Sequence, residues 1–379
     1  MHIAYITSEY PHSALPPAGG IGSFVKTMAD SLVKENHQVT VFLCFSDEDK
    51  EWYDGQIRIV QIRKSDLSKI SVLTNRIRIN KVINRYIKQY NIQLVEAPDW
   101  EGIHAFCSFN VPLITRIHGS VTYFNTLESR KPSTIIRFLE KRALQKSTAV
   151  VAVSNFAGKT TGEVFALKGF NYTTIYNGID TSKFVNTENI TEENTILYFG
   201  TLIRKKGVLE IPYILEKVLE RVPHAKLILA GKDAVDPIEK ISTWQLMQDK
   251  ISEKAMKNVT YLGAVPYHNI SELIKKSRLC VFPSFAEAFP ISWLEAMALG
   301  KALITSNIGW ANESIEDYIS GFLIDPRDHT TFAEKIIEVL SEDVLAKQLG
   351  ENARERVVQL FDQKEILKQN LDFYKRLIL

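Results

Sequence analysis

Short apolar runs alternate with longer amphipathic stretches along the whole chain. Runs rich in Val, Ile, Leu and Tyr, each typical of a buried β-strand, occupy residues 3–7, 38–44, 57–60, 93–96, 113–117, 149–153, 173–175, 195–199, 226–230, 259–262, 278–282 and 302–305. Stretches with helical spacing lie between many of these runs, for example residues 22–34, 208–222, 270–276 and 290–299. This alternation predicts parallel sheets whose strands are connected by right-handed crossover helices.

A single polar stretch interrupts the alternation. Residues 180–194 are crowded with Thr, Ser, Asn and Glu and carry no apolar period. A chain of 379 residues also exceeds one typical hydrophobic core. We therefore expect an α/β protein with two doubly wound, Rossmann-like parallel-sheet domains, residues 1–182 and residues 183–360. Ligands of such sheets bind beyond the carboxyl ends of the strands, so the two domains should face each other across a cleft.

Composition adds limits to this picture. The net charge of +2 gives no strong bias toward nucleic acid. Cys44, Cys107 and Cys280 lie in or near apolar segments and form no C-x-x-C pair, which indicates reduced core thiols and a cytosolic compartment. The first residues read as a core strand rather than a signal peptide, and no apolar run approaches the ~20 residues that span a bilayer. We expect a soluble, cytoplasmic protein.

The most informative segment, residues 280–300, reads strand, loop, helix and stop. Pro290 suits the first helical turn, because its missing N–H would have no partner there, and Gly300 suits a left-handed helix end. The first helical amides, near Pro290, Ile291 and Ser292, should therefore point outward. Together with the helix dipole they predict an anion site suited to a pyrophosphate.

Two carboxylates flank this anion site. Glu287 precedes the helix, and Glu295 lies about five residues inside it, which corresponds to roughly 7 Å of helical rise. One can hold hydroxyls of a sugar and the other hydroxyls of a ribose. Two surface glutamates at this spacing are common, but here they occur together with Pro290, Gly300 and a preceding apolar strand. The Glu287-(seven residues)-Glu295 pattern resembles the E-x7-E motif of the family-four retaining glycosyltransferases, which have the GT-B fold.

The segment from residue 198 to residue 207 extends the resemblance. It is similar to the Gly-Arg…Lys-Gly segment of that family, whose basic residues neutralise the donor diphosphate. Lys206 matches the family lysine by its position before Gly207. The usual arginine is replaced by Thr201, and Arg204 could supply a guanidinium from another point of the loop. A solvated basic turn is the alternative for Arg204 and Lys205.

Further matches at strand ends imply the rest of the site. The catalytic residues implied by the resemblance are His118, Glu287 and Lys206. The implied donor-binding residues are Arg204, Lys206, Gly263, Val265, Glu287, Phe289, Pro290, Ile291 and Glu295. The implied acceptor-side residues are Glu9, Gly19, Gly20, Asp99 and Asn155. A solvated loop acid is the ordinary alternative for Glu9, and a structural histidine is the alternative for His118.

The resemblance also implies a mechanism. Anomeric configuration is retained, and an oxygen of the leaving diphosphate accepts the proton of the acceptor hydroxyl. Lys206 and the helix N-terminus stabilise the charge on that diphosphate, while Glu287 orients the sugar. A final helix, residues 361–379, crosses back to the first domain. Since protein cations are already expected at the pyrophosphate and no paired-His motif is present, we expect no metal and no cofactor beyond the nucleotide sugar.

Other enzyme classes remain open. A sugar phosphorylase or a nucleotide-sugar epimerase could share this fold, and a non-catalytic nucleotide-sugar-binding module would bind without turnover. A dinucleotide-dependent dehydrogenase is disfavoured because no G-x-G-x-x-G loop occurs. The expected acceptor is a saccharide or a lipid-linked saccharide, as in bacterial polysaccharide, lipopolysaccharide or glycolipid assembly.

Charge is unevenly distributed along the chain. Residues 1–182 hold 21 Lys and Arg against 16 Asp and Glu, and residues 55–90 hold nine bases and one acid. Residues 72–90 interleave apolar side chains with five bases, Arg76, Arg78, Lys81, Arg85 and Lys88. Such a basic amphipathic helix can lie on an anionic membrane. A solvated helix face packed on the core is an equal alternative.

Overall fold

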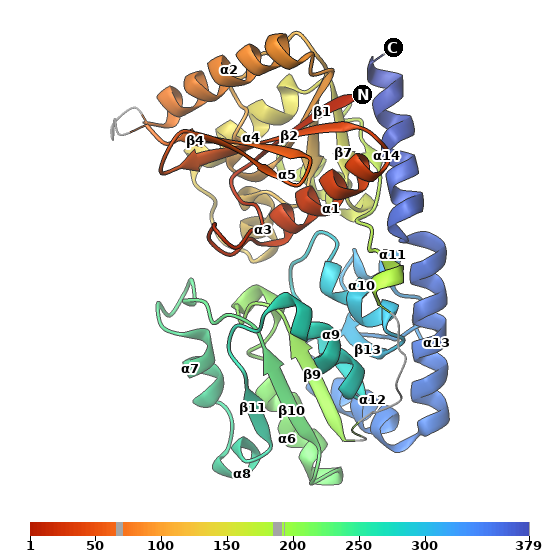
Figure 1. Ribbon diagram of the computed structural model, residues 1–379. Coiled ribbons are helices and arrows are strands. Elements are labelled where there is room, and N and C mark those ends of the chain that lie inside the picture. The colour runs from red at the N-terminus through yellow and green to blue at the C-terminus, as the bar shows by residue number, and fades with distance from the viewer. Residues whose placement is uncertain (66–70, 185–191, 193, 379) are drawn as a thin grey trace. The chain divides into compact units, whose positions relative to one another are not determined.

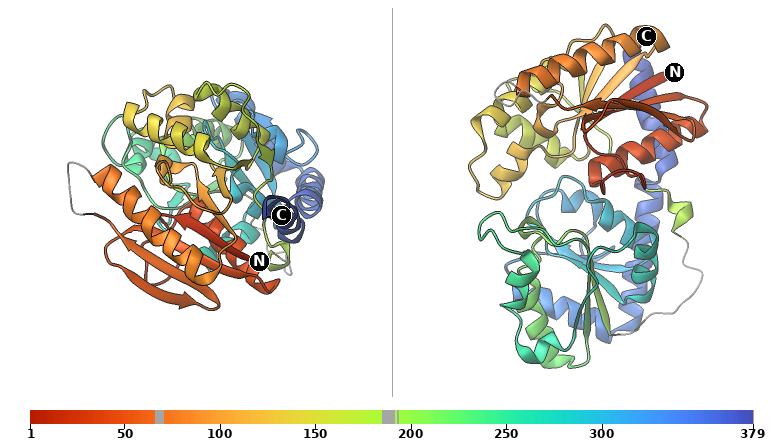
Figure 2. Two further views of the ribbon diagram at one scale, coloured as in Figure 1. Left: turned by 90° about the horizontal axis from the view of Figure 1, so that it is seen from above. Right: turned by 60° about the vertical axis from the view of Figure 1, so that its left-hand side comes forward.

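The computed structural model describes residues 1–65, 71–184, 192 and 194–378 (Figure 1). The chain divides into two compact units, one comprising Met1–Asn177 and Gln363–Leu379, the other Gly178–Asp362. Each unit is built on its own sheet, and the views in Figure 2 show helices on both faces of each sheet. The prediction of two doubly wound α/β domains is therefore confirmed. Of the expected linker, residues 185–191 and 193 lie outside the described residues.

The first unit has an eight-stranded sheet with the order β3-β4-β2-β1-β5-β6-β7-β8. The strands are β1 (His2–Thr7), β2 (Gln38–Ser46), β3 (Lys50–Asp54), β4 (Ile57–Arg63), β5 (Leu94–Pro98), β6 (Leu113–Ile117), β7 (Ala149–Ala152) and β8 (Thr173–Thr174). All neighbours are parallel except β3 and β4, which form an antiparallel hairpin at the sheet edge. The apolar pattern did not predict β3, because this edge strand is mostly polar and no side chain of it is fully buried.

Helices cover both faces of the first sheet. They are α1 (Gly20–Lys34), α2 (Ser71–Tyr90), the 3-10 turn η1 (Trp100–Gly102), α3 (Val121–Leu127), α4 (Thr134–Lys146), α5 (Asn155–Val164) and α14 (Gln363–Ile378). The helices α1 and α14 share one hydrophobic core with the sheet, and α2 packs into a second core on the other face (Figure 1). All three cysteines are buried and unpaired, as predicted.

The last helix, α14, is fixed to the first sheet by a buried polar cluster. The Arg116 Nε donates to Glu96 Oε1 (2.6 Å), and the Tyr374 hydroxyl donates to Glu96 Oε2 (2.7 Å). Arg116 also bonds to Asn370. Burial opposes the charge of Arg116, but the Glu96 carboxylate beside it outweighs this effect and raises the pKa of the guanidinium. Because removing one partner would leave a buried charge unpaired, this cluster holds the end of the chain in the first unit.

The second unit has a six-stranded parallel sheet with the order β11-β10-β9-β12-β13-β14. The strands are β9 (Thr195–Phe199), β10 (Lys226–Ala230), β11 (Val259–Tyr261), β12 (Leu279–Phe282), β13 (Ala302–Ser306) and β14 (Phe322–Ile324). The helical segments are η2 (Thr181–Lys183), η3 (Arg204–Lys206), α6 (Ile211–Arg221), α7 (Thr243–Gln248), α8 (Glu253–Met256), α9 (Tyr267–Lys276), α10 (Ile291–Ala298), α11 (Ala311–Ser314), α12 (His329–Ser341) and α13 (Asp343–Leu360).

The strand order locates the ligand-binding edge of each unit. In the second sheet the order reverses between β9 and β12, and in the first sheet it reverses between β1 and β5. Doubly wound sheets bind their ligands beyond the carboxyl ends of the strands at such a reversal. The loops that follow β9 and β12, and those that follow β1 and β5, are therefore the ones to inspect for chemistry.

Candidate functional site

The reversal in the second sheet brings a lysine and a glutamate together. Lys206 ends η3, in the loop after β9, and Glu287 lies in the loop after β12. The Lys206 Nζ lies 3.2 Å from Glu287 Oε1, with 22% and 11% of the two side chains exposed. Two residues 81 positions apart thus form a partly exposed ion pair at the edge where the fold predicts a ligand.

Backbone bonds join the two loops that carry this ion pair. The Lys205 carbonyl accepts from the amides of Phe285 (2.8 Å) and Ala286 (3.1 Å). Gly207 has a φ of +68° and lies against the backbone of Pro283. A glycine is needed here both for the left-handed backbone and for the close approach of the two loops. Lys206 and Glu287 therefore hold their positions through the main chain as well as through their charges.

We predict that Gly207→Ala destabilises the second unit much more than Gly263→Ala. Both glycines have left-handed φ values, +68° and +67°, so an alanine at either position costs about 1–2 kcal/mol of backbone strain. A Cβ at residue 207 would lie 1.7 Å from the Pro283 carbonyl oxygen, whereas a Cβ at residue 263 meets no atom within 4 Å. Urea unfolding should show an excess loss of about 1–3 kcal/mol for Gly207→Ala. Equal losses of unfolding free energy in the two variants would mean that the loops carrying Gly207 and Pro283 can move apart without loss of stability.

The start of α10 differs in one detail from the prediction of an anion site. Pro290 is the N-cap residue and precedes the helix, which begins at Ile291. The outward-pointing amides of the first turn are therefore those of Ile291 and Ser292, not that of Pro290, which has no N–H. At the other end Gly300 has a φ of +66°, and its amide donates to the Met297 carbonyl (2.9 Å). The prediction of a left-handed glycine stop is confirmed.

Glu295 lies on α10 in a largely apolar setting. Only 6% of the residue is exposed, and burial raises the pKa of its carboxyl to about 7. Interactions with the Tyr267 hydroxyl and with the Lys206 ammonium act in the opposite direction. Lys206 is thus electrostatically coupled to both carboxylates of the motif. Tyr267 was not predicted as a site residue, and only its position two residues after Val265 could have suggested it.

The Arg204 guanidinium has a partner inside the second unit. Its Nε and Nη2 donate to the two carboxylate oxygens of the buried Asp236, at 2.8 and 3.1 Å. Asp236 in turn accepts from the amides of Ile238 and Glu239. Arg204 therefore fixes the loop after β10, and its charge is balanced by Asp236. Its role as a substitute for the arginine missing at Thr201 stays a prediction.

Other predicted donor residues surround the same edge. The Gly263 carbonyl, beyond β11, accepts from the amide of Gly231 (2.8 Å), beyond β10, so the two loops are joined there as well. Val265 is partly exposed in the same loop. Phe289 is buried, and its ring packs edge-on against Phe361 at a centroid distance of 5.2 Å. Phe289 is thus placed to support the loop before α10.

In the first unit, Glu9 occupies the start of α1. Its carboxylate accepts from the amides of Gly19 (2.9 Å) and Gly22 (2.7 Å). A Cβ at residue 19 would lie 3.2 Å from Glu9 Oε2, whereas Gly20 has open space around it. The loop after β1 is therefore closed onto the positive end of the α1 dipole. Of the three predicted acceptor-side residues in this loop, Gly20 is the one that offers room.

His118 and Asp99 come together at the ends of β6 and β5. The Asp99 Oδ1 accepts from the His118 amide (2.9 Å), and only 1% of Asp99 is exposed. Burial raises the pKa of Asp99 to about 8. Burial, together with the nearby Arg116, lowers the pKa of His118 to about 3, so its imidazole is neutral near pH 7. Asp99 is thus positioned to orient the His118 backbone, and it presents almost no surface to a ligand.

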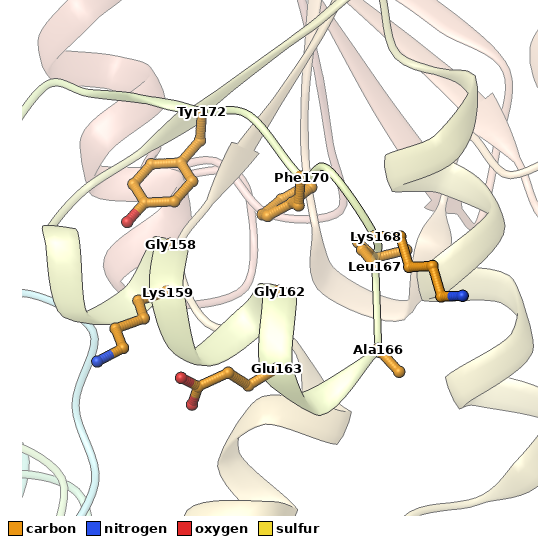
Figure 3. Close-up of a pocket in the computed structure, with 9 residues that line it drawn as sticks. All are labelled: Gly158, Lys159, Gly162, Glu163, Ala166, Leu167, Lys168, Phe170 and Tyr172. Atoms are coloured by element: carbon orange, nitrogen blue, oxygen red, sulfur yellow. The ribbon is translucent and has the colours of Figure 1, made fainter.

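Asn155 begins α5, and a surface hollow of about 490 Å³ is lined by later residues of this helix and of the segment after it, from Gly158 to Tyr172. Figure 3 shows the rings of Phe170 and Tyr172 above the part of the helix that contains Gly158 and Gly162. A Cβ at residue 158 would lie 2.3 Å from the Tyr172 ring, so a side chain there would displace it. The Tyr172 hydroxyl donates to the Asn155 carbonyl (3.2 Å), which connects the hollow to a predicted acceptor-side residue.

Within residues 1–65, 71–184, 192 and 194–378, no cluster of three or more His, Cys, Asp or Glu side chains has a geometry suited to a metal ion. Cations of the protein itself, above all Lys206, lie at the edge where an anion is predicted.

Two family models match adjacent halves of the chain. The model described as Glycosyltransferase Family 4 matches residues 18–183, and the model described as Glycosyl transferases group 1 matches residues 180–356. Together they cover both units, and they meet close to the division at Asn177 and Gly178.

Individual proteins are similar over nearly the full length. An uncharacterized glycosyltransferase of Methanocaldococcus jannaschii, MJ1607, is 25% identical, with 99% of this chain and 98% of that protein covered. Glycogen synthase of Mycobacterium tuberculosis is 23% identical, with 99% and 94% covered. The crystal structure of Anabaena Alr3699/HepE in complex with UDP and glucose matches with a TM-score of 0.76 and 18% identity over 100% of both chains.

Proposed function

Because this chain belongs to the family-four glycosyltransferases with the GT-B fold, we propose that it is a retaining enzyme that moves a hexose-type sugar from a nucleotide-diphosphate sugar to a hydroxyl acceptor. The observation that carries the proposal is the contact between Lys206 and Glu287 at the strand-order reversal of the second sheet. A cation for a diphosphate and a carboxylate for a sugar stand next to each other there. Glu295, one turn inside α10, is the carboxylate that we assign to the ribose hydroxyls.

The proposed roles follow from charge. Lys206 and the first amides of α10 stabilise the negative charge that grows on the leaving diphosphate. Glu287 faces the anomeric carbon, which gains positive charge as the bond to the diphosphate breaks. The acceptor hydroxyl gives its proton to the departing diphosphate oxygen. His118 is a poor base because its pKa is lowered to about 3. Its proposed role is therefore a hydrogen bond between its neutral ring and either a hydroxyl of the donor sugar or the acceptor.

The donor and acceptor classes are also part of the proposal. UDP-glucose is the first donor to test, since a protein of the same fold was crystallised with UDP and glucose. A saccharide acceptor in polysaccharide or glycolipid assembly fits the similarity to a glycogen synthase. The three buried, unpaired cysteines agree with a cytoplasmic location. None of the described helices is both long enough and apolar enough to cross a bilayer.

A screen of nucleotide sugars tests the proposal directly. Thermal shift with UDP-, GDP- and ADP-sugars identifies the donor, and product analysis then follows with and without an added saccharide acceptor. Acceptor-dependent release of the nucleoside diphosphate, with an unchanged anomeric configuration in the product, is the expected result. Product formed without any acceptor would instead indicate an epimerase, or a phosphorylase if phosphate is required. Binding without turnover would indicate a non-catalytic module.

Transfer is predicted to continue in excess chelator. The diphosphate would be held by Lys206 and by the helix start of α10, so no divalent ion is needed to neutralise it. Initial rates with EDTA should equal those with Mg²⁺ or Mn²⁺ within about twofold, far below the effect of losing one electrostatic stabiliser. Complete loss in chelator, restored by either ion, would reject the metal-independent mechanism.

A further inference from the structure

The first turns of α2 expose three apolar side chains. Val72, Leu73 and Ile77 are 44%, 47% and 55% exposed, whereas Ile79 and Ile83, further along the same helix, are buried. At about 100° per residue, Leu73 and Ile77 point away from the side that holds Ile79 and Ile83, and Val72 lies on that side but in the first turn. The helix therefore has a core-facing apolar side and, at its beginning, a second apolar surface that touches no core. A solvated helix face would carry polar side chains at these positions.

The start of α4 has the same property. Ile135 and Phe138 are 61% and 56% exposed, although the next residue, Leu139, is buried. Exposing the apolar side chains of phenylalanine and isoleucine to water is unfavourable. Two of them close together at the start of one helix indicate that another surface covers them. The sequence pattern gave no reason to single out this helix.

A buried arginine connects the two helix starts. The Arg76 Nε donates to the Gly102 carbonyl (3.0 Å), and its Nη2 donates to the Glu101 carbonyl (2.7 Å). A Cβ at residue 102 would lie 2.4 Å from the Leu139 backbone, so η1 lies directly against α4. The starts of α2 and α4 therefore flank η1. Arg76 was predicted as part of an exposed basic face, and this is wrong, because only 5% of it is exposed.

The remaining charges of the two helices have one sign. The single acid on them, Glu140, is fully buried and accepts from the amides of Val121 (2.9 Å) and Thr122 (3.1 Å). The basic side chains that are at least partly exposed are Arg78, Lys81, Arg85, Lys88, Arg137, Lys141, Arg142 and Lys146. Glu101 of η1 is exposed between the two helices, and Asp49 pairs with Arg78, but the helices themselves expose only basic charges. An apolar patch with this excess of bases complements an anionic lipid surface, whose interior is apolar and whose headgroups are negative.

The patch also lies toward the reactive edge of the first sheet. The helix α2 leads into β5 and α4 leads into β7, so both helices end at the amino ends of parallel strands. Their starts therefore lie toward the carboxyl edge, where the Glu9 loop and His118 are found. A surface that covers the patch would be close to the acceptor-side residues of this unit.

We propose that Val72, Leu73, Ile77, Ile135 and Phe138 form a lipid-docking patch that inserts into the interface of an anionic membrane. The basic side chains on α2 and α4 contact the headgroups around it. The patch presents the carboxyl edge of the first sheet to the bilayer, which suits an acceptor held on a lipid carrier. This last consequence rests on the proposed transferase function, whereas docking itself does not.

Vesicle sedimentation of the full chain tests the docking without any turnover. The probes are vesicles of phosphatidylcholine alone and vesicles of equal parts phosphatidylcholine and phosphatidylglycerol. We expect about tenfold more protein bound to the anionic vesicles at low salt, with less binding at high salt. The double variant Ile77→Glu/Phe138→Glu should lose that binding. The matched control Val344→Glu places the same charge at a 79% exposed apolar position of the second unit and should bind like wild type.

A second measurement separates insertion from simple charge attraction. A tryptophan introduced as Phe138→Trp should shift its fluorescence emission to shorter wavelength on anionic vesicles, because it enters an apolar layer. Equal binding to both vesicle types, or unchanged binding by a folded double variant, would overturn the proposal. So would sedimentation without an emission shift. Self-association that the double variant abolishes, without vesicle binding, would assign the patch to a second copy of the chain. Donor hydrolysis assays on the same variants report the transferase function separately.

Discussion

Replacing Glu287 with glutamine is expected to lower turnover by roughly a hundredfold or more, the effect of losing one electrostatic stabiliser in a preorganised site. Glutamine keeps the shape of the side chain but removes the charge that would face the developing positive charge of the sugar. That interaction is made mainly in the transition state, so its loss lowers turnover rather than ground-state affinity. Lys206 loses its partner at 3.2 Å and keeps its own charge, so the affinity for nucleoside diphosphate should hold or increase.

Glu295→Ala should give the opposite division of effects. The ribose contacts that we assign to Glu295 change little during the reaction, so their loss weakens ground state and transition state alike. Donor and free nucleotide should both bind more weakly by about 1–3 kcal/mol, the range for a lost charge-assisted hydrogen bond. Turnover at saturating donor should be far less affected.

Steady-state kinetics and calorimetric titration with the nucleoside diphosphate measure both changes. The control is Glu338→Gln, which removes a glutamate charge from an ion pair with Lys335 on α12 and should change neither quantity. If Glu287→Gln lost nucleotide affinity while Glu295→Ala lost only turnover, the orientation of the donor would be reversed. If both folded variants behaved like wild type, the site would lie elsewhere and the proposed mechanism would fail.

The fold could be predicted where burial leaves a strong local pattern. Central parallel strands such as β9, Thr195–Phe199, are buried on both faces and therefore appear as continuous apolar runs. The strand β3 escaped because it lies at a sheet edge and pairs on one side with β4 alone. The strand β14, Phe322–Ile324, was not predicted either, although the equally short β11, Val259–Tyr261, lies in a predicted run.

The sequence could indicate which residues belong to the candidate site, but not which side chains pair with one another. Lys206 and Glu287 could be found because each stands beside helix and turn residues with strict local geometry, Gly207 and Pro290. Nothing in local spacing connects Arg204 with Asp236, which lies 32 residues later. The same holds for Arg76, two of whose three carbonyl partners are 25 and 26 residues away. Side-chain pairing across loops depends on tertiary packing, so a basic residue in a periodic pattern can be buried as readily as exposed.

The buried carboxyl of Glu295 should make the stability of the second unit depend on pH. Its pKa is about 7 in the folded protein, against 4.5 for an ordinary glutamate, and the main cause is burial. The folded state therefore holds a proton that the unfolded chain releases between these two values. The contribution of Glu295 to the free energy of unfolding is therefore fully present below pH 4.5 and is lost as the pH rises through 7.

Glu295→Gln should remove this dependence, because the amide is neutral at every pH and has nearly the shape of the protonated acid. The free energy of unfolding of the variant, minus that of wild type, is expected to increase from pH 5 to pH 8. The full shift corresponds to a change on the order of 3 kcal/mol. Urea unfolding of both proteins at several pH values measures this difference, and other titrating groups cancel in the subtraction. The Tyr267 hydroxyl and Lys206 both lower the pKa, so replacing Tyr267 with phenylalanine should move the midpoint upward. A difference that stays constant from pH 5 to pH 8 would show that Glu295 is already ionised in the folded protein, and that water reaches it.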